Sequence, residues 1–217
     1  MAILEIYTFP DQILRKKAET VTVFDQELER TVQSMLETMY VSSGIGLAAI
    51  QAGILKQIIV IDLKSGEEDK SLREPHVFIN PKIVTQSGTT VSEEGCLSVP
   101  GFTGIIERSV TIDASYLDQN KSKIKLTASE LLSQAIEHEI DHLNGIVYLD
   151  HLKSHEDLHK SGVTPNDIHW HDIGYKIFIN KAKASSQDKI IDEVIDKKIE
   201  LSKIKSDSSI DEASVDI

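Results

Sequence analysis

The segment His138-Glu139-Ile140-Asp141-His142 sets two histidines around a carboxylate in a stretch that is otherwise rich in apolar residues. The surrounding sequence predicts a helix, because apolar side chains recur at helical spacing and Thr127 and Glu130 have the spacing of a capping box. We expect this helix to run from Thr127 to about Leu143 and to end at Asn144-Gly145. Its apolar stripe is broad, which predicts burial on more than one side: Leu131, Leu132, Ala135, Ile136, Ile140 and Leu143.

Residues four apart project from the same face of a helix, so the imidazoles of His138 and His142 can converge on one metal ion. Glu139 can then reach a water that the metal binds and act as a general base. The alternative is a pair of ordinary helical histidines that happen to flank a carboxylate. Burying three polar side chains without partners is costly, and this cost favours metal binding.

The remaining sequence predicts a second helix and several short strands. The helix covers residues 25–43, with Asp25 as its N-cap, and stops at Ser42-Ser43-Gly44. We expect strands over residues 57–63, 76–81, 82–86, 109–117 and 123–126, the last two joined as a hairpin by Asp118-Gln119-Asn120. Alternation in the fourth strand places Val110, Ile112, Ala114 and Tyr116 on one face.

These elements show no repeating βαβ order, which predicts an α+β fold. In this fold, short antiparallel or mixed β-sheets pack around a buried helix that carries the HExxH motif.

The composition limits the kinds of function that the chain can have. With 23 basic and 35 acidic residues among 217, the net charge is −12, so we expect no direct nucleic-acid binding. Apolar runs such as residues 58–63 are far shorter than the ~20 residues of a membrane span, so no membrane association is expected. The N-terminus lacks the pattern of a signal peptide. A single cysteine without an export signal indicates the cytoplasm.

Cys96 is the single cysteine, so it forms no internal disulfide and serves as a core residue, a nucleophile or a metal ligand. Two histidines leave a catalytic metal site one ligand short. In one class of HExxH proteases a third histidine follows a glycine, and this chain has Gly145 but places Tyr148 at the histidine position. Cys96 is the remaining candidate, because a thiolate is a good ligand for zinc or iron(II).

Three segments, Gly44–Gln51, Glu94–Ser98 and His138–Gly145, resemble in this order the three signature motifs of the peptide deformylases. The first segment alone is typical of a helix end or a packing contact. The N-terminus is also similar to the family in Pro10-Asp11 and in Leu14-Arg15. The resemblance covers roughly residues 1–150, and its motifs are specific.

The resemblance implies an enzyme that removes the N-formyl group from the initiator N-formylmethionine of newly made polypeptides and releases formate. It implies that Cys96, His138 and His142 hold one divalent metal ion, typically iron(II), with zinc, nickel or cobalt as alternatives. A metal-bound water would attack the formyl carbonyl, with Glu139 as general base and then general acid. The Gln51 amide and the backbone N–H of Leu97 would stabilise the oxyanion.

The resemblance also indicates how the substrate is bound. The peptide would lie extended along Ile45 and Gly46, and Arg108 is a further candidate for substrate binding, with a surface ion pair as the alternative. The methionine side chain would enter a pocket beside the metal-binding helix. The family often lines this pocket with apolar residues, but here Ser133-Gln134 precedes Ala135, which predicts a more polar or differently shaped pocket.

We divide the chain into a catalytic domain over residues 1–152, a C-terminal extension over 153–205 with a helix at 186–204, and a disordered tail over 206–217. The predicted partners are formyl-methionyl nascent polypeptides and, transiently, the ribosome, although acidic residues outnumber the lysines of the C-terminal helix. We expect a monomer or a weak dimer. The rival interpretations are a zinc endopeptidase of the HExxH type and a catalytically inactive homologue that acts as a binding protein.

Overall fold

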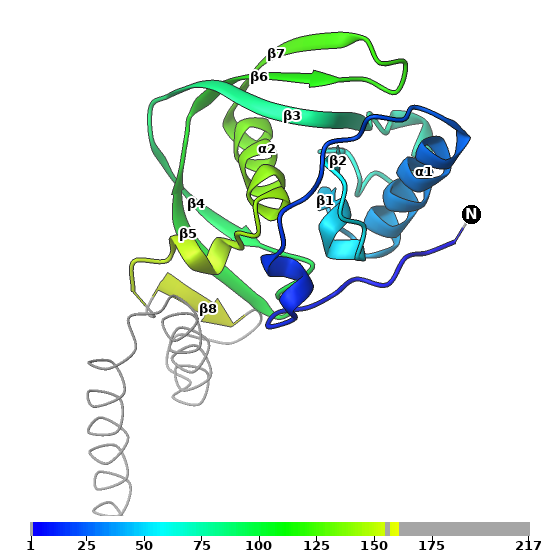
Figure 1. Ribbon diagram of the computed structural model, residues 1–217. Coiled ribbons are helices and arrows are strands. Elements are labelled where there is room, and N and C mark those ends of the chain that lie inside the picture. Colours follow the sequence, from blue (N-terminus) through cyan, green and yellow to red (C-terminus); the bar gives the residue numbers. More distant parts are fainter. Residues whose placement is uncertain (1, 155–156, 161–217) are drawn as a thin grey trace, which may run out of the picture.

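The computed structural model describes residues 2–154 and 157–160, and this part folds into two antiparallel β-sheets and two α-helices (Figure 1). The larger sheet has the order β1-β2-β3-β6-β7 and the smaller one the order β4-β5-β8. The predicted α+β class is confirmed. The helices are α1 (Gln26–Val41) and α2 (Glu130–Leu143); the strands are β1 (Gly46–Ala48), β2 (Ile58–Ile61), β3 (His76–Ser87), β4 (Thr90–Gly95), β5 (Phe102–Arg108), β6 (Thr111–Leu117), β7 (Lys123–Ser129) and β8 (Leu158–Lys160).

Helix α2 lies at the centre of the molecule, with β3, β6 and β7 on one side and β4 and β5 on another (Figure 1). It packs on one face of the larger sheet through side chains that include Ile59 and Ile61. The opposite face of the same sheet packs against α1 through Ile58 and Val60. Because successive strand residues point to opposite faces, all four residues of β2 are buried.

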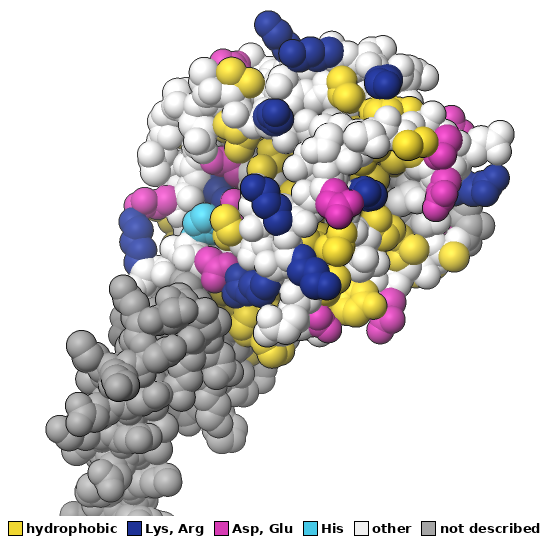
Figure 2. All heavy atoms as spheres, in the orientation of Figure 1, with side chains coloured by type: hydrophobic (Ala, Val, Ile, Leu, Met, Phe, Trp, Pro, Cys, Tyr) yellow, Lys and Arg dark blue, Asp and Glu magenta, His cyan; other side chains and the backbone are white. Residues whose placement is uncertain are grey.

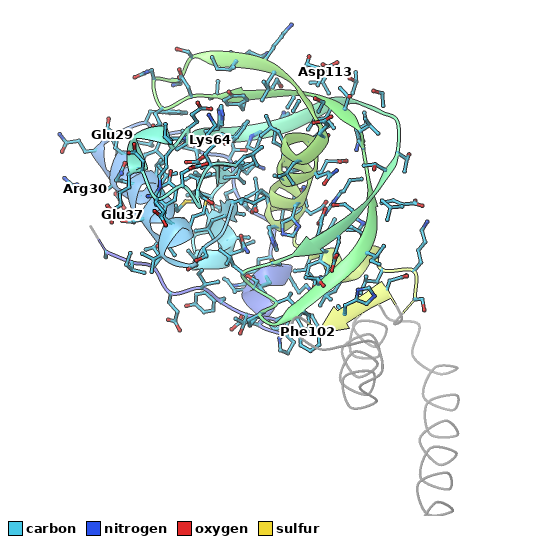
Figure 3. The ribbon with its side chains drawn as sticks, turned by 180° about the vertical axis from the view of Figure 1, so that it is seen from behind. Glu29, Arg30, Glu37, Lys64, Phe102 and Asp113 are labelled. Atoms are coloured by element: carbon cyan, nitrogen blue, oxygen red, sulfur yellow. The ribbon has the colours of Figure 1, made fainter. Side chains whose placement is uncertain are left out.

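Helix α1 confirms its predicted N-cap. The Asp25 carboxylate accepts hydrogen bonds from the N–H groups of Glu27 and Leu28, both at 3.0 Å. Its apolar positions are buried as the periodicity predicts: Leu28, Val32, Met35, Leu36 and Met39. Charged side chains labelled in Figure 3, Glu29, Arg30 and Glu37, lie on the side of α1 away from the sheet.

Residues 76–87 form one strand, so the prediction of two separate runs is wrong. Pro81 interrupts the pattern, but the register shifts between Ile79 and Lys82 and the strand continues. Asn80 adopts a positive φ of 52°. Its side-chain amide exchanges hydrogen bonds of 2.8 and 2.9 Å with the backbone of Val21, which holds the irregular segment in place. The first part of β3 therefore pairs with β2 and the second part with β6.

The predicted hairpin is confirmed as β6 and β7, but the predicted start of α2 is wrong. Strand β7 continues to Ser129, and the Thr127 hydroxyl donates to the Asp113 carboxylate across the hairpin at 2.7 Å instead of capping the helix. The N-cap is Ser129, which makes no side-chain capping bond. Val110 lies outside β6 and is 38% exposed, so it does not share the buried face of Ile112.

On the face shown in Figure 2, lysine and arginine side chains are interspersed with acidic and apolar ones. None of the helices in the described part is both long and apolar enough to cross a bilayer. The helix predicted at 186–204 and the tail at 206–217 lie outside the described residues. From the predicted extension, β8 pairs with β5, so Leu158 lies opposite Gly104.

Candidate metal centre

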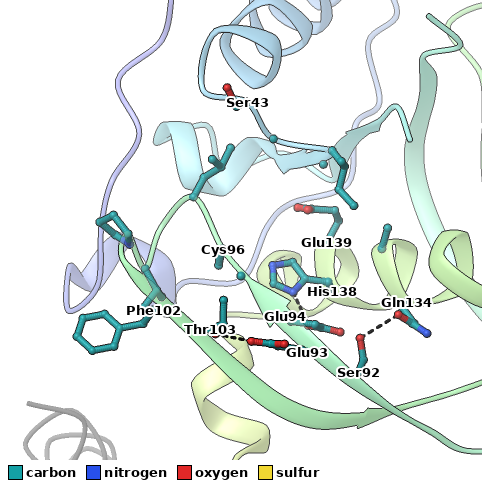
Figure 4. A pocket seen from close by; sticks show the side chains of 18 of the residues that line it. Ser43, Ser92, Glu93, Glu94, Cys96, Phe102, Thr103, Gln134, His138 and Glu139 are labelled. Carbon is teal, nitrogen blue, oxygen red and sulfur yellow. Dashed lines mark hydrogen bonds and ion pairs between the residues drawn. The ribbon is translucent and has the colours of Figure 1, made fainter. Parts of the chain in front are cut away.

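A cavity of about 490 Å³ opens beside the central helix. One side is formed by residues 43–46, which lead into β1, and another by β4 and the loop that follows it. Strands β1 and β4 are edge strands of their respective sheets, so each has one side without a neighbouring strand in the described part. The floor is formed by α2 residues, including His138 and Glu139 (Figure 4).

Cys96, His138 and His142 converge at this floor. Their sulfur and nitrogen ligand atoms lie within 4.8 Å of one another, and no other such group occurs among residues 2–154 and 157–160. The Cys96 Sγ is 3.2 Å from Nε2 of His142. The two histidines lie one helical turn apart on α2, and Cys96 directly follows the end of β4, which brings it to the same point.

Glu94 fixes the orientation of His138. The Nδ1 of His138 lies 2.7 Å from Oε2 of Glu94, which leaves Nε2 for the cluster. Burial alone would raise the pKa of Glu94, but hydrogen bonds from His138 and Arg108 outweigh burial and lower the pKa to about 2. Glu94 is therefore ionised and accepts the Nδ1 proton, as the carboxylate behind a metal-bound histidine does. Sequence reasoning missed this role. The available signal was that Glu94 lies two residues before Cys96 near the end of a strand.

Arg108 lies behind this carboxylate and is not among the residues that line the cavity. Its guanidinium donates to both oxygens of Glu94, at 2.8 and 3.0 Å, and to Asp141 at 2.6 Å. Since Arg108 is only 5% exposed, the predicted alternative of a surface ion pair is wrong. The residue links β4 and α2 through its bonds to Glu94 and Asp141.

Glu139 extends from α2 toward the first motif. Its carboxylate is buried, and Oε2 has no hydrogen-bond partner among the described residues. Burial raises the pKa of Glu139 to about 7, although the neighbouring His138 acts to lower it. A Cβ at Gly46 would overlap the Glu139 carboxylate, so the glycine makes this approach possible. The structure thereby brings Gly46 and Glu139 together.

Gln51 and Leu97 flank Cys96. The Gln51 Oε1 accepts the Ala48 N–H at 2.8 Å, and this bond directs Nε2 toward Ser98 Oγ at 3.1 Å and Cys96 Sγ at 3.5 Å. The backbone N–H of Leu97 makes no hydrogen bond within the described structure, so it is available to a ligand in the cavity. Ile45 also lines the cavity and is 38% exposed.

The donor set fits a metal ion. One thiolate and two imidazoles are ligands that zinc and iron(II) accept, and three protein ligands leave a fourth position open. Burial and the neighbouring His138 lower the pKa of His142 well below its usual value, which keeps the imidazole neutral as a ligand must be.

Comparison with known proteins shows which family the chain belongs to. The sequence profile of the polypeptide deformylase family matches residues 3–157. A peptide deformylase of Thermodesulfovibrio yellowstonii is 47% identical over 150 residues, which cover 69% of this chain and 89% of that protein. This chain belongs to the peptide deformylase family.

Solved structures of peptide deformylases share its fold. The Synechococcus elongatus peptide deformylase in complex with actinonin is 43% identical, with a TM-score of 0.66 over 70% of this chain and 81% of that one. The Met-Ala-Ser-bound peptide deformylase of Acinetobacter baumannii is 27% identical, with a TM-score of 0.64 over 70% of this chain and 99% of that one.

Tyr148, which stands where the extended HExxH motif has its third histidine, packs against His138. Its ring stacks on His138 with centroids 6.4 Å apart, behind the metal cluster. Gly104 leaves room for the ring, since a Cβ there would overlap it. The Tyr148 side chain is buried and its hydroxyl has no partner in the described part of the chain, so it fills space beside a ligand.

Proposed function

We propose that this peptide deformylase removes the formyl group from N-formylmethionyl peptides with Cys96, His138 and His142 holding one divalent metal ion, iron(II) in the first place and zinc, nickel or cobalt otherwise. The observation that carries the proposal is the convergence of the three ligand atoms within 4.8 Å of one another. When bound, such an ion supplies a Lewis acid and lowers the pKa of the water that it holds.

Glu139 is the proton carrier. Its unpartnered Oε2 takes a proton from the attacking water while the water oxygen forms a bond to the formyl carbon. The carboxylic acid then delivers this proton to the leaving nitrogen as the C–N bond breaks, which gives formate and a free amine. The pKa of about 7 for Glu139 supports both halves of this transfer at neutral pH.

Two donors stabilise the negative charge that develops on the formyl oxygen. The Leu97 N–H is free within the described structure, and Gln51 Nε2 is held near Cys96 by the bond between its own Oε1 and Ala48 N. Preorganised donors of this kind contribute roughly 3 to 4 kcal/mol each to the transition state. Because Gln51 is only 1% exposed, its amide has few other positions available.

In the part of the chain that the structure describes, β1 and β4 each have a free edge that can hold the peptide. Both border the cavity, and an extended peptide binds such an edge through backbone hydrogen bonds. Ile45 and Gly46 would provide contacts on the β1 side. Arg108 binds Glu94 and Asp141 in the described structure, so we propose that it acts on the substrate only through the orientation of His138.

The test is formate release from formyl-Met-Ala-Ser by the full chain, purified without oxygen and analysed for bound metal. We expect formate from the wild type and at least a hundredfold less from Glu139→Gln, which keeps the shape of the side chain but cannot take a proton from water. Glu29→Gln, on the outward side of α1, is the matched control and should retain full activity. Absence of formate from metal-loaded wild-type protein would refute the function and direct attention to protease substrates and to binding partners.

The wider setting follows from this function. A substrate that is a formyl-methionyl nascent polypeptide supports a location in the cytoplasm. The remaining proposed partner is the ribosome, through a transient contact. The predicted monomer or weak dimer, and the division into a catalytic domain over 1–152 with an extension over 153–205, are further parts of the proposal.

A further inference from the structure

One part of the cavity wall combines polar and apolar side chains. Ser92 and Gln134 both line the cavity, and the Ser92 hydroxyl donates to Oε1 of Gln134 at 2.9 Å (Figure 4). Their neighbours in the wall are Leu131, which is 50% exposed, and Ala135. The sequence predicts that Leu131 belongs to the buried apolar stripe of α2, but in the structure it borders the cavity instead of the core.

The position of this pair follows from the geometry of β4 and α2. Ser92 precedes Glu94 by two strand residues, so both point to the same side of β4 and both are buried. Gln134 precedes His138 by one helical turn, so both lie on one face of α2. The Ser92–Gln134 bond therefore lies next to the Glu94–His138 bond, and Gln134 lies about 6 Å along the helix from His138.

The pair has hydrogen-bonding capacity to spare. A hydroxyl and a primary amide together offer three donor hydrogens, and the bond between them uses one. In the part of the chain that the structure describes, the Gln134 amide nitrogen donates to no protein group. A ligand in this part of the cavity thus meets free N–H donors among apolar side chains.

We infer that the Ser92–Gln134 pair lets this enzyme accept a polar side chain on the formylated residue, in particular methionine sulfoxide. The inference rests on the proposed function, because it places that side chain in the wall next to the metal cluster. A sulfoxide oxygen is a strong acceptor, and an entirely apolar wall would leave it unpaired. The Gln134 amide can donate to it instead. Deformylation itself is unchanged: water adds to the formyl carbon, the C–N bond breaks, and the sulfoxide leaves the enzyme without being reduced.

The experiment compares kcat/KM for three peptides, formyl-Met-Ala-Ser and its analogues with methionine sulfoxide or norleucine at the first position. Norleucine has the length of methionine and no polar atom. For the wild type we expect the sulfoxide peptide to be within about tenfold of the norleucine peptide. Gln134→Leu keeps much of the side-chain volume and removes both amide donors. It should lower the sulfoxide-to-norleucine ratio about tenfold, which corresponds to about 1.4 kcal/mol.

Two further variants make the result decisive. Ser92→Val removes the hydroxyl that bonds to Gln134 Oε1, so the amide is less well oriented and the sulfoxide-to-norleucine ratio should fall. Valine suits this strand position, so the variant provides a second test if Gln134→Leu folds poorly. Gln33→Leu makes the same chemical change on the exposed side of α1 and should leave the ratio as in the wild type. An unchanged ratio in the folded Gln134 and Ser92 variants would overturn the inference while leaving the deformylase function intact. Absence of formate from every peptide would instead refute the function, and this inference with it.

Discussion

Glu137 and Glu139 lie two residues apart on α2 and are almost equally buried, at 7% and 5% exposure, but their carboxylates have opposite surroundings. Glu137 accepts hydrogen bonds from the Ser109 N–H at 2.8 Å, the Ser109 hydroxyl at 3.0 Å and the Gln86 amide at 2.7 Å. Glu139 has an oxygen with no partner in the described structure and a pKa raised to about 7. One side of α2 thus satisfies its buried carboxylate with protein donors, whereas the other leaves a carboxylate oxygen without a partner beside the cavity in the described structure.

This comparison separates stability from catalysis along a single helix. A buried carboxylate with three donors holds β3, the link between β5 and β6, and α2 together, and its loss leaves those donors unpaired. A buried carboxylate without enough donors contributes little to folding and is a candidate for proton transfer. The two sides are joined through Arg108, which binds Glu94 on the cavity side and Asp141 on the other.

Exchanging each glutamate for glutamine should produce opposite results. Glu139→Gln should lower kcat by about 10²- to 10⁴-fold, because the proton carrier is lost, and should change the free energy of unfolding little. Glu137→Gln should lower the free energy of unfolding by about 1–3 kcal/mol, because its amide group cannot accept all three bonds, and kcat should stay at the wild-type value. Formate kinetics and urea denaturation on both variants measure this. A large loss of kcat in folded Glu137→Gln would remove the distinction between the two sides.

Gly46→Ala tests whether the cavity side depends on the close approach of Glu139. The new Cβ would overlap the carboxylate, so the base must move, and a displacement of about 1 Å can cost about 10²-fold in rate. Metal affinity should be retained, since the three atoms nearest to the added Cβ all belong to Glu139 and none to Cys96, His138 or His142. Gly66→Ala is the matched control, because nothing lies within 4 Å of the added Cβ. Full activity in Gly46→Ala would show that the glycine is not needed for the base.

Arg108→Gln tests the link between the two sides. Glu94 would lose two hydrogen bonds, so His138 would be less well oriented, and we expect metal affinity to fall about 10- to 100-fold. Removing one partner of a buried ion pair should also lower the free energy of unfolding by about 3 kcal/mol. Competition with a chelator measures the first effect and urea denaturation the second.

The control for this variant is Lys153→Gln, which breaks an exposed ion pair with Glu107. Surface pairs contribute little, so neither quantity should change measurably. If metal affinity in Arg108→Gln equals that of the wild type, Arg108 is a structural residue alone and the two sides of α2 are independent.

The same contrast explains what could be predicted from the sequence. The convergence of His138 and His142 depends on local helical geometry, so spacing alone indicates it. The N-cap of α1 is equally local. The predicted capping box of α2 is wrong because the Thr127 hydroxyl donates to Asp113, a residue of another strand. The burial of Arg108 could not be predicted for the same reason, because the carboxylates that bind it, on Glu94 and Asp141, lie 14 and 33 residues away in the chain.

Leu131 shows a second limit of sequence reasoning. Periodicity places it in the apolar stripe of α2, and its hydrophobicity does not distinguish a residue of the core from one that lines a cavity. In the structure it is 50% exposed at the cavity, whereas Ile136 on the same helix is fully buried. Only the position of β4 and of the first motif decides which apolar residues face a substrate.

The smallest expected effect comes from a change remote from both sides of α2. Asp25→Ala removes the cap of α1 and leaves the N–H groups of Glu27 and Leu28 without their partner, which should lower the free energy of unfolding by about 1 kcal/mol. Asp25→Asn can still accept these bonds and should cost less. Metal affinity and kcat/KM should be unchanged in both, because α1 packs on the face of the larger sheet opposite to α2. A drop in metal affinity with Asp25→Ala would mean that the sheet transmits changes to the cluster, and Arg108 would then not be the main link between stability and the metal site.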